Sequence, residues 1–148
     1  MIDGAPKEYT QVAWTPAVAK KFGVAIGRPE GQTAWEYLMM FLALVVWADS
    51  FRHCGLIVLG DNLAALAGIL NLRGRRAITV VTRELAWRRV RFAWRYAAGH
   101  LPAEHNLLAD ALSRLDAPAG SEHKVFPAEL LDVTRRPAPA FDELWVCT

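Results

Sequence analysis

The chain has few cysteines, little net charge and no apolar run of membrane-spanning length, and each shortage excludes a class of protein. Cys54 and Cys147 are its only cysteines. They are too few and too far apart for a zinc site or a secreted disulfide framework, so we expect a reducing intracellular setting, cytoplasm or nucleus. The uncharged run 37–48 is well short of the roughly 20 residues of a spanning helix. The opening MIDGAPKEY also lacks the basic and apolar regions of a secretory signal.

Apolar residues and arginines, by contrast, are abundant. The 148 residues are 53% hydrophobic and include six tryptophans, which predicts one packed domain with its own core. The net charge is only +2, but the segment 73–95 holds eight arginines and the single acid Glu84, a local +7 that leaves −5 for the remainder. Such asymmetry predicts a basic face for a polyanion, with a solvated helix face as the alternative.

The first half reads as alternating strands and helices. A loosely alternating strand is expected over 7–14, followed by a helix that starts at Thr15-Pro16 and stops at Gly23. A long helix over 32–48 is apolar on too many sides for one stripe, so it must be buried. The apolar run GLIVLG at 55–60 is typical of a strand covered on both faces.

The second half continues the alternation up to residue 115. Asn62 can cap a helix that ends near residue 72, and a further helix over 79–90 precedes a strand over 91–97. A helix over 106–115 closes the globular part. We therefore expect a domain over 1–115 and a proline-containing extension over 116–148, which either packs or stays extended.

Three acids fall where they can converge on a metal. Asp61 follows the strand 55–60, at the strand end where open α/β sheets bind ligands. Glu36 and Asp110 each sit one turn into a predicted helix, and His100 lies on the loop before the last one. Carboxylates from separate elements suit Mg²⁺ or Mn²⁺, and two such ions about 3.5–4 Å apart support phosphodiester hydrolysis, with His100 moving a proton.

Each of these residues also has a structural alternative. Asp110 lies four residues before Arg114, as in a helix-surface ion pair. Asp61-Asn62 is an ordinary turn and cap signal, and Glu36 is equally compatible with the solvent side of an apolar helix. A lone loop histidine such as His100 is more often structural than catalytic.

The closing segment carries a family resemblance. The closing segment resembles the last motif of the ribonuclease H domain of retroelement reverse transcriptases of the DIRS or gypsy-like kind, through His100, Pro102-Ala103, Glu104, Asn106 and the run Ala109-Asp-Ala-Leu-Ser-Arg. Gly60-Asp61-Asn62 and Trp35-Glu36 are similar to two earlier motifs. The resemblance implies a three-layer α/β/α ribonuclease H-like fold with a mixed sheet. It further implies a Mg²⁺- or Mn²⁺-dependent nuclease that cuts the RNA strand of RNA–DNA hybrids.

The resemblance assigns roles and also marks a departure. Glu36, Asp61 and Asp110 would be metal ligands, and His100 the mobile histidine. The family carries a fourth acid in its first strand, but that first hairpin is missing or truncated here unless Asp3 is a displaced copy. A catalytically degenerate module that binds nucleic acid or another protein, such as the rest of a reverse transcriptase polyprotein, is therefore the alternative.

The arginine-rich segment supplies the expected nucleic-acid contacts. Arginine guanidinium groups would bind phosphates without sequence preference, and tryptophan rings would stack on sugars or bases. The residues proposed for nucleic-acid binding are Asn62, Arg83, Trp87, Arg88 and Arg91, with Arg95 as a further phosphate contact. For Trp94, on the predicted strand, we prefer a core position.

Overall fold

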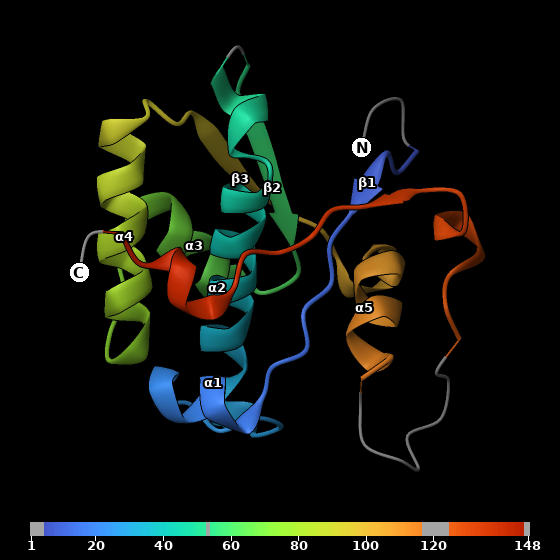
Figure 1. Cartoon of the computed structure of the whole chain (residues 1–148), viewed down its shortest axis with the longest axis horizontal. Helices are drawn as coiled ribbons and strands as arrows, with labels where there is room; N and C mark the ends of the chain where they lie inside the picture. Colours follow the sequence, from blue (N-terminus) through green and yellow to red (C-terminus); the bar gives the residue numbers. More distant parts are fainter. Residues whose placement is uncertain (1–4, 53, 117–124, 147–148) are drawn as a thin grey trace.

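The computed structural model describes residues 5–52, 54–116 and 125–146, and it is a mixed α/β structure (Figure 1). Its strands form two parallel pairs: β2 (Leu56–Gly60) with β3 (Tyr96–His100), and β1 (Glu8–Tyr9) with β4 (Thr134–Arg135). The described residues form five α-helices, namely α1 (Pro16–Phe22), α2 (Pro29–Val46), α3 (Leu63–Asn71), α4 (Ala77–Arg91) and α5 (Leu107–Arg114). There are also short 3-10 helices, labelled η1 (Ala48–Arg52), η2 (Ala103–His105), η3 (Ala128–Leu130) and η4 (Phe141–Leu144).

Helix α1 begins and ends as its sequence predicts. The Thr15 side chain accepts a hydrogen bond from the Val18 amide at 3.3 Å, which satisfies a backbone donor that the helix leaves free. Gly23 ends the helix in the left-handed conformation at φ 72°, where glycine is unstrained. The predicted helix boundaries are confirmed because both signals are local.

Helix α2 lies at the centre of the core. It begins at Pro29, three residues before the predicted start, because proline suits the first helical position. Its Leu38 and Phe41 side chains are completely buried, and α3 and α4 pack on it (Figure 1). The prediction of burial on several sides is confirmed. No helix within the described residues combines the length and the apolar character that crossing a membrane requires.

Strand β2 is covered on one face, so the prediction that both faces are buried is wrong. Leu56 and Val58 pack against the core, but Ile57 is 71% exposed and Leu59 46%. Helix α3 contacts both β2 and β3. The strands also form two separate parallel pairs there, in place of the single mixed sheet that the resemblance implies.

The strand predicted over 91–97 begins later than expected. Helix α4 continues to Arg91, and the chain then turns through Ala93, whose φ is 53°. Strand β3 starts only at Tyr96. Trp94 is 5% exposed and belongs to the core, as preferred from the sequence. The arginines that precede β3 therefore lie on a helix end and a turn.

Residues 125–146, named here the C-terminal segment, pack on the rest of the molecule. Strand β4 pairs with β1, and Leu130 and Leu144 are 2% and 1% exposed. Trp145 stacks on the Phe41 ring at 6.0 Å between centroids. Figure 1 shows the segment crossing from β1 over α2 toward α4. Of the two alternatives for this region, packing is the one observed.

Candidate carboxylate site

Two of the predicted site residues lie at the same edge of the β2–β3 pair. Gly60 and His100 are partners in the parallel register, and the Leu101 amide donates to the Gly60 carbonyl at 2.8 Å. Asp61 directly follows β2, and His100 ends β3. Because the carboxyl ends of parallel strands meet at one edge, Asp61 and His100 are brought to it together.

Glu36 faces this edge from α2. Since α2 begins at Pro29, Glu36 is in its second turn and not one turn in as predicted. Burial raises the pKa of the Glu36 carboxyl, and the negative charge of Asp61 adds to the increase, while hydrogen bonds from Gln32 and Asn62 oppose it. The Glu36 Oε2 atom is buried and has no hydrogen-bond partner among the described residues. We call Glu36 and Asp61 the carboxylate pair.

Asn62 holds the strand-to-helix turn beside the pair. Its Oδ1 accepts from the Ala65 amide at 2.9 Å, which caps α3. Its Nδ2 donates to Thr33 Oγ1 on α2 at 3.2 Å. Both ends of the amide are therefore used within the fold, so the cap predicted from the sequence is present. Any contact of Asn62 with nucleic acid would compete with these bonds.

Asp110 is engaged elsewhere. It lies in the first turn of α5, as predicted, and its Oδ2 accepts from Arg114 Nε at 2.9 Å, both side chains being about half exposed. The helix-surface pair that the sequence offered as an alternative is thus present. No group of three or more histidine, cysteine, aspartate or glutamate side chains placed to hold a metal occurs in the described part of the chain. Asp3 lies outside that part.

The carboxylate pair by itself suits a hard divalent cation. Glu36 offers a buried oxygen, and the exposed Asp61 interacts electrostatically with the same carboxyl; carboxylate oxygens are the donors that Mg²⁺ or Mn²⁺ prefers. A cation there would satisfy that oxygen and reduce the mutual repulsion of the two acids. Two carboxylates fall short of the three predicted ligands, because Asp110 is paired with Arg114.

Arg88 is not available to a phosphate, so its prediction as a nucleic-acid contact is wrong. Its Nε donates to Glu84 Oε1 at 2.8 Å, and the two residues are 8% and 1% exposed. Its Nη2 donates to the Leu144 carbonyl at 3.1 Å, and Glu84 accepts from the Val146 amide at 3.0 Å. The arginine is buried because it fastens the C-terminal segment to α4.

The other predicted nucleic-acid residues lie on the outer side of α4 or beyond its end. Arg83, Arg91 and Arg95 are exposed, and Trp87 is half-buried. The Trp87 ring meets Phe92 edge to face at 5.6 Å. Figure 1 shows α4 at the margin of the molecule, away from the end of β2 where Asp61 follows. These residues are therefore not grouped with the carboxylate pair.

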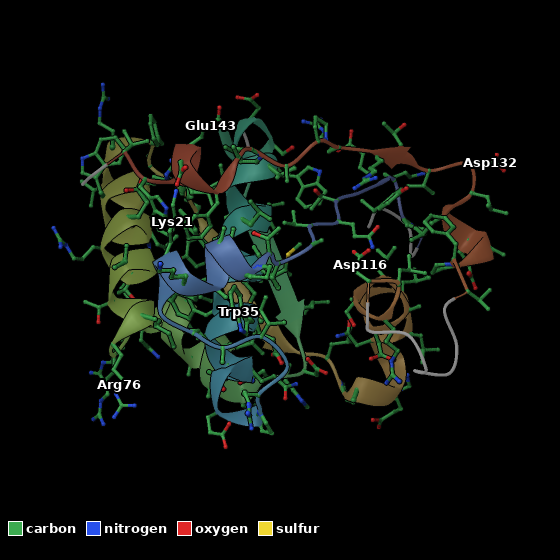
Figure 2. The ribbon with its side chains drawn as sticks, turned by 60° about the horizontal axis from the view of Figure 1, so that its bottom comes forward. Lys21, Trp35, Arg76, Asp116, Asp132 and Glu143 are labelled. Atoms are coloured by element: carbon green, nitrogen blue, oxygen red, sulfur yellow. The ribbon has the colours of Figure 1, made fainter. Side chains whose placement is uncertain are left out.

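A second group of arginines, missed from the sequence, lies closer to it. Arg28, Arg75 and Arg76 line a cavity of about 530 Å³ at the start of α2 and α4, together with Glu30 and Thr33. The described residues supply no ion pair to any of the three arginines. Figure 2 shows Arg76 reaching outward from the start of α4. We call this the basic cavity.

The basic cavity adjoins the carboxylate pair through one residue. Thr33 lines the cavity and also accepts the hydrogen bond from Asn62, which contacts Glu36. The sequence shows that neither α2 nor α4 has an acidic or small polar residue at its cap, where Arg28 and Arg76 stand. An arginine at a helix cap is unusual and can be noticed in the sequence. That the two caps lie together cannot, because the distance between them depends on how the helices pack.

Comparisons with models of protein families, with curated proteins and with solved structures gave no match. The resemblance to ribonuclease H therefore depends on the sequence motifs around Glu36, Asp61 and Asp110.

Proposed function

We propose that this chain is the ribonuclease H-like module of a retroelement reverse transcriptase, which binds RNA–DNA hybrids and hydrolyses their RNA strand with Mg²⁺ or Mn²⁺. The observation that carries the proposal is the electrostatic interaction between the Glu36 carboxyl on α2 and Asp61, which directly follows β2. The motif from His100 to Arg114 supports the same assignment. The ribonuclease H-like topology is part of this proposal.

The residues at the carboxyl edge of β2 and β3 would have different roles in hydrolysis. Glu36 and Asp61 would hold the cation, which when bound supplies positive charge to the phosphate and lowers the pKa of a coordinated water. His100 is exposed at the end of β3, where it would move a proton during the reaction. The orphaned oxygen of Glu36 favours cation binding because the cation offers its missing partner.

The basic cavity supplies the contact to the nucleic-acid backbone. Its three arginines carry a charge of +3 against the single negative charge of Glu30. Guanidinium groups bind phosphate oxygens with paired hydrogen bonds and without reading sequence, as hybrid recognition by shape requires. A duplex phosphate in the basic cavity would leave the strand close to the carboxylate pair, because Thr33 borders both.

One observation favours a second function, a module that binds hybrids without cutting them. Asp110 is paired with Arg114, and only two of the three predicted ligands meet. A two-metal reaction needs more carboxylate ligands than this pair supplies. Binding through the basic cavity needs none of them.

Cleavage of a labelled RNA–DNA hybrid in Mg²⁺ or Mn²⁺ tests both functions. The nuclease is expected to cut, and Glu36→Gln and Asp61→Asn to reduce the rate by about 100-fold or more, as the loss of an essential group does. Asp132→Asn, an exposed acid of the C-terminal segment, is the matched control and should cut normally. Equal cutting by all variants would indicate a contaminant, and salt-sensitive binding without cutting would favour the second function.

A further inference from the structure

The outer face of α4 combines exposed apolar residues with arginines and contains no acid. Val80 is 41% exposed and Val90 85%, and both lie within about 100° of arc with Arg83, Trp87 and Arg91 by the helical repeat. We call these five residues the α4 stripe. An ordinary exposed helix face carries charges of both signs. The α4 stripe differs because the only acid of α4, Glu84, is buried and paired with Arg88, so it presents no negative charge to solvent.

The aromatic end of α4 extends the same surface. Phe92 follows the helix and is 49% exposed, with its ring against Trp87 at 5.6 Å and the Arg91 guanidinium 5.8 Å from its centroid. Aromatic side chains and arginines are the residues most enriched at the centres of protein interfaces. The two exposed valines beside them add apolar area, which an apolar partner surface would bury and a phosphate backbone would not.

We propose that the α4 stripe and Phe92 form a docking surface for an acidic segment of a protein partner. The charge identifies the partner: Arg83 and Arg91 project positive charge on this face, so carboxylates beside apolar side chains complement it. The surface shares no residue with the carboxylate pair or with the basic cavity. The proposal is independent of the nuclease and assigns the sequence-predicted residues Arg83, Trp87 and Arg91 to a protein contact.

Titration of the full chain with a defined peptide tests the surface. The probe is a synthetic helical peptide with leucines along one face and glutamates on its flanks, and its control has lysine for every glutamate. The glutamate peptide should bind and shift backbone amide resonances of residues 80–92, and the lysine peptide should not bind. Shifts elsewhere, or equal binding of both peptides, would overturn the proposal.

Two variants sharpen the test without disturbing the core. Val90→Asp and Arg91→Glu change exposed side chains and should weaken binding of the glutamate peptide by about tenfold or more. Lys20→Glu on the exposed face of α1 makes the same charge change as Arg91→Glu and should leave the affinity unchanged. Binding of an RNA–DNA hybrid should be unaffected by Val90→Asp. If Val90→Asp lost hybrid binding, the stripe would be a nucleic-acid contact. If the original chain self-associated and Val90→Asp did not, the stripe would be a contact with a second copy of the chain. Either result would overturn the proposal.

Discussion

The centre of the molecule and its side are held together by different forces. The centre, formed by α2, α3, α4, β2 and β3, buries large side chains such as Phe41 and Leu38 completely. The side layer is formed by β1, β4 and α5. Helix α5 has no buried residue, and β1 and β4 pair over only two residues each. Glu36 and Asp61 belong to the centre and Asp110 to the side layer, so the predicted site spans a rigid part and a loosely attached one.

This contrast explains why the predicted site is only partly assembled. A few polar bonds attach α5 to its surroundings, notably from Gln11 Nε2 to the Leu112 carbonyl and to Asp116 Oδ2, each at 3.2 Å. Such bonds contribute about 0.5–1.5 kcal/mol each, which is small beside the burial of a core side chain. The position of Asp110 is therefore set by weak contacts, and those of Glu36 and Asp61 by strong ones.

The largest expected effect is at the buried pair of the centre. Arg88→Ala leaves the Glu84 carboxylate buried and uncompensated and should lower the free energy of unfolding by about 3–5 kcal/mol. Urea denaturation measures the change. Arg83→Ala, an exposed arginine of the same helix, should change it by less than about 0.5 kcal/mol. If the two substitutions lowered the free energy of unfolding equally, the Glu84–Arg88 pair would not stabilise the fold.

A second substitution tests whether the C-terminal segment belongs to the centre. Leu144→Ala deletes a side chain that is 1% exposed and should cost about 2–5 kcal/mol of unfolding free energy. Leu131→Ala, in the same segment but 71% exposed, is the control and should be nearly neutral. If both were neutral, the segment would be an appendage and the centre would end with β3.

A smaller effect is expected in the side layer. Gln11→Ala removes both hydrogen bonds to the end of α5 and should cost about 1–2 kcal/mol at most. Hydrogen exchange should accelerate at the amides of α5 and stay unchanged at those of α2. Acceleration at both helices would mean that α5 and the centre open as one unit.

The smallest effect concerns Glu36, where burial and the Asp61 charge raise the pKa of the carboxyl above its usual 4.5. As the pH rises past that value, the unfolded chain releases its proton before the folded one, so stability falls and stays lower above the folded pKa. Glu36→Gln removes this loss. The variant should gain stability relative to the original chain at about pH 7 and lose that gain near about pH 4.

Metal provides the complementary measurement at the same residue. Millimolar Mg²⁺ should raise the melting temperature of the original chain relative to a chelator control, since a cation that binds only the folded state stabilises it. The rise should disappear in Glu36→Gln. An equal rise in both proteins would locate the cation away from the carboxylate pair.

The sequence by itself determined the features that depend on neighbouring residues. Thr15 and Gly23 bound α1, Asn62 caps α3, and Asp110 pairs with Arg114, because capping bonds and contacts four residues apart form within a turn or two of chain. The sequence also predicted that Asp61 follows a strand and that Glu36 lies on a buried helix, and both positions are confirmed. Metal binding by the two residues stays a prediction.

Only the tertiary structure decided which charges stay in solvent and which are enclosed. Arg88 stands among exposed arginines in the sequence, yet it is buried because Glu84 and the Leu144 carbonyl, 56 residues away, meet its guanidinium. The basic cavity likewise joins Arg28 to Arg75 and Arg76 through the packing of two helices. The physical reason is that burial and pairing between distant segments depend on how whole elements pack, which no local pattern of residues specifies.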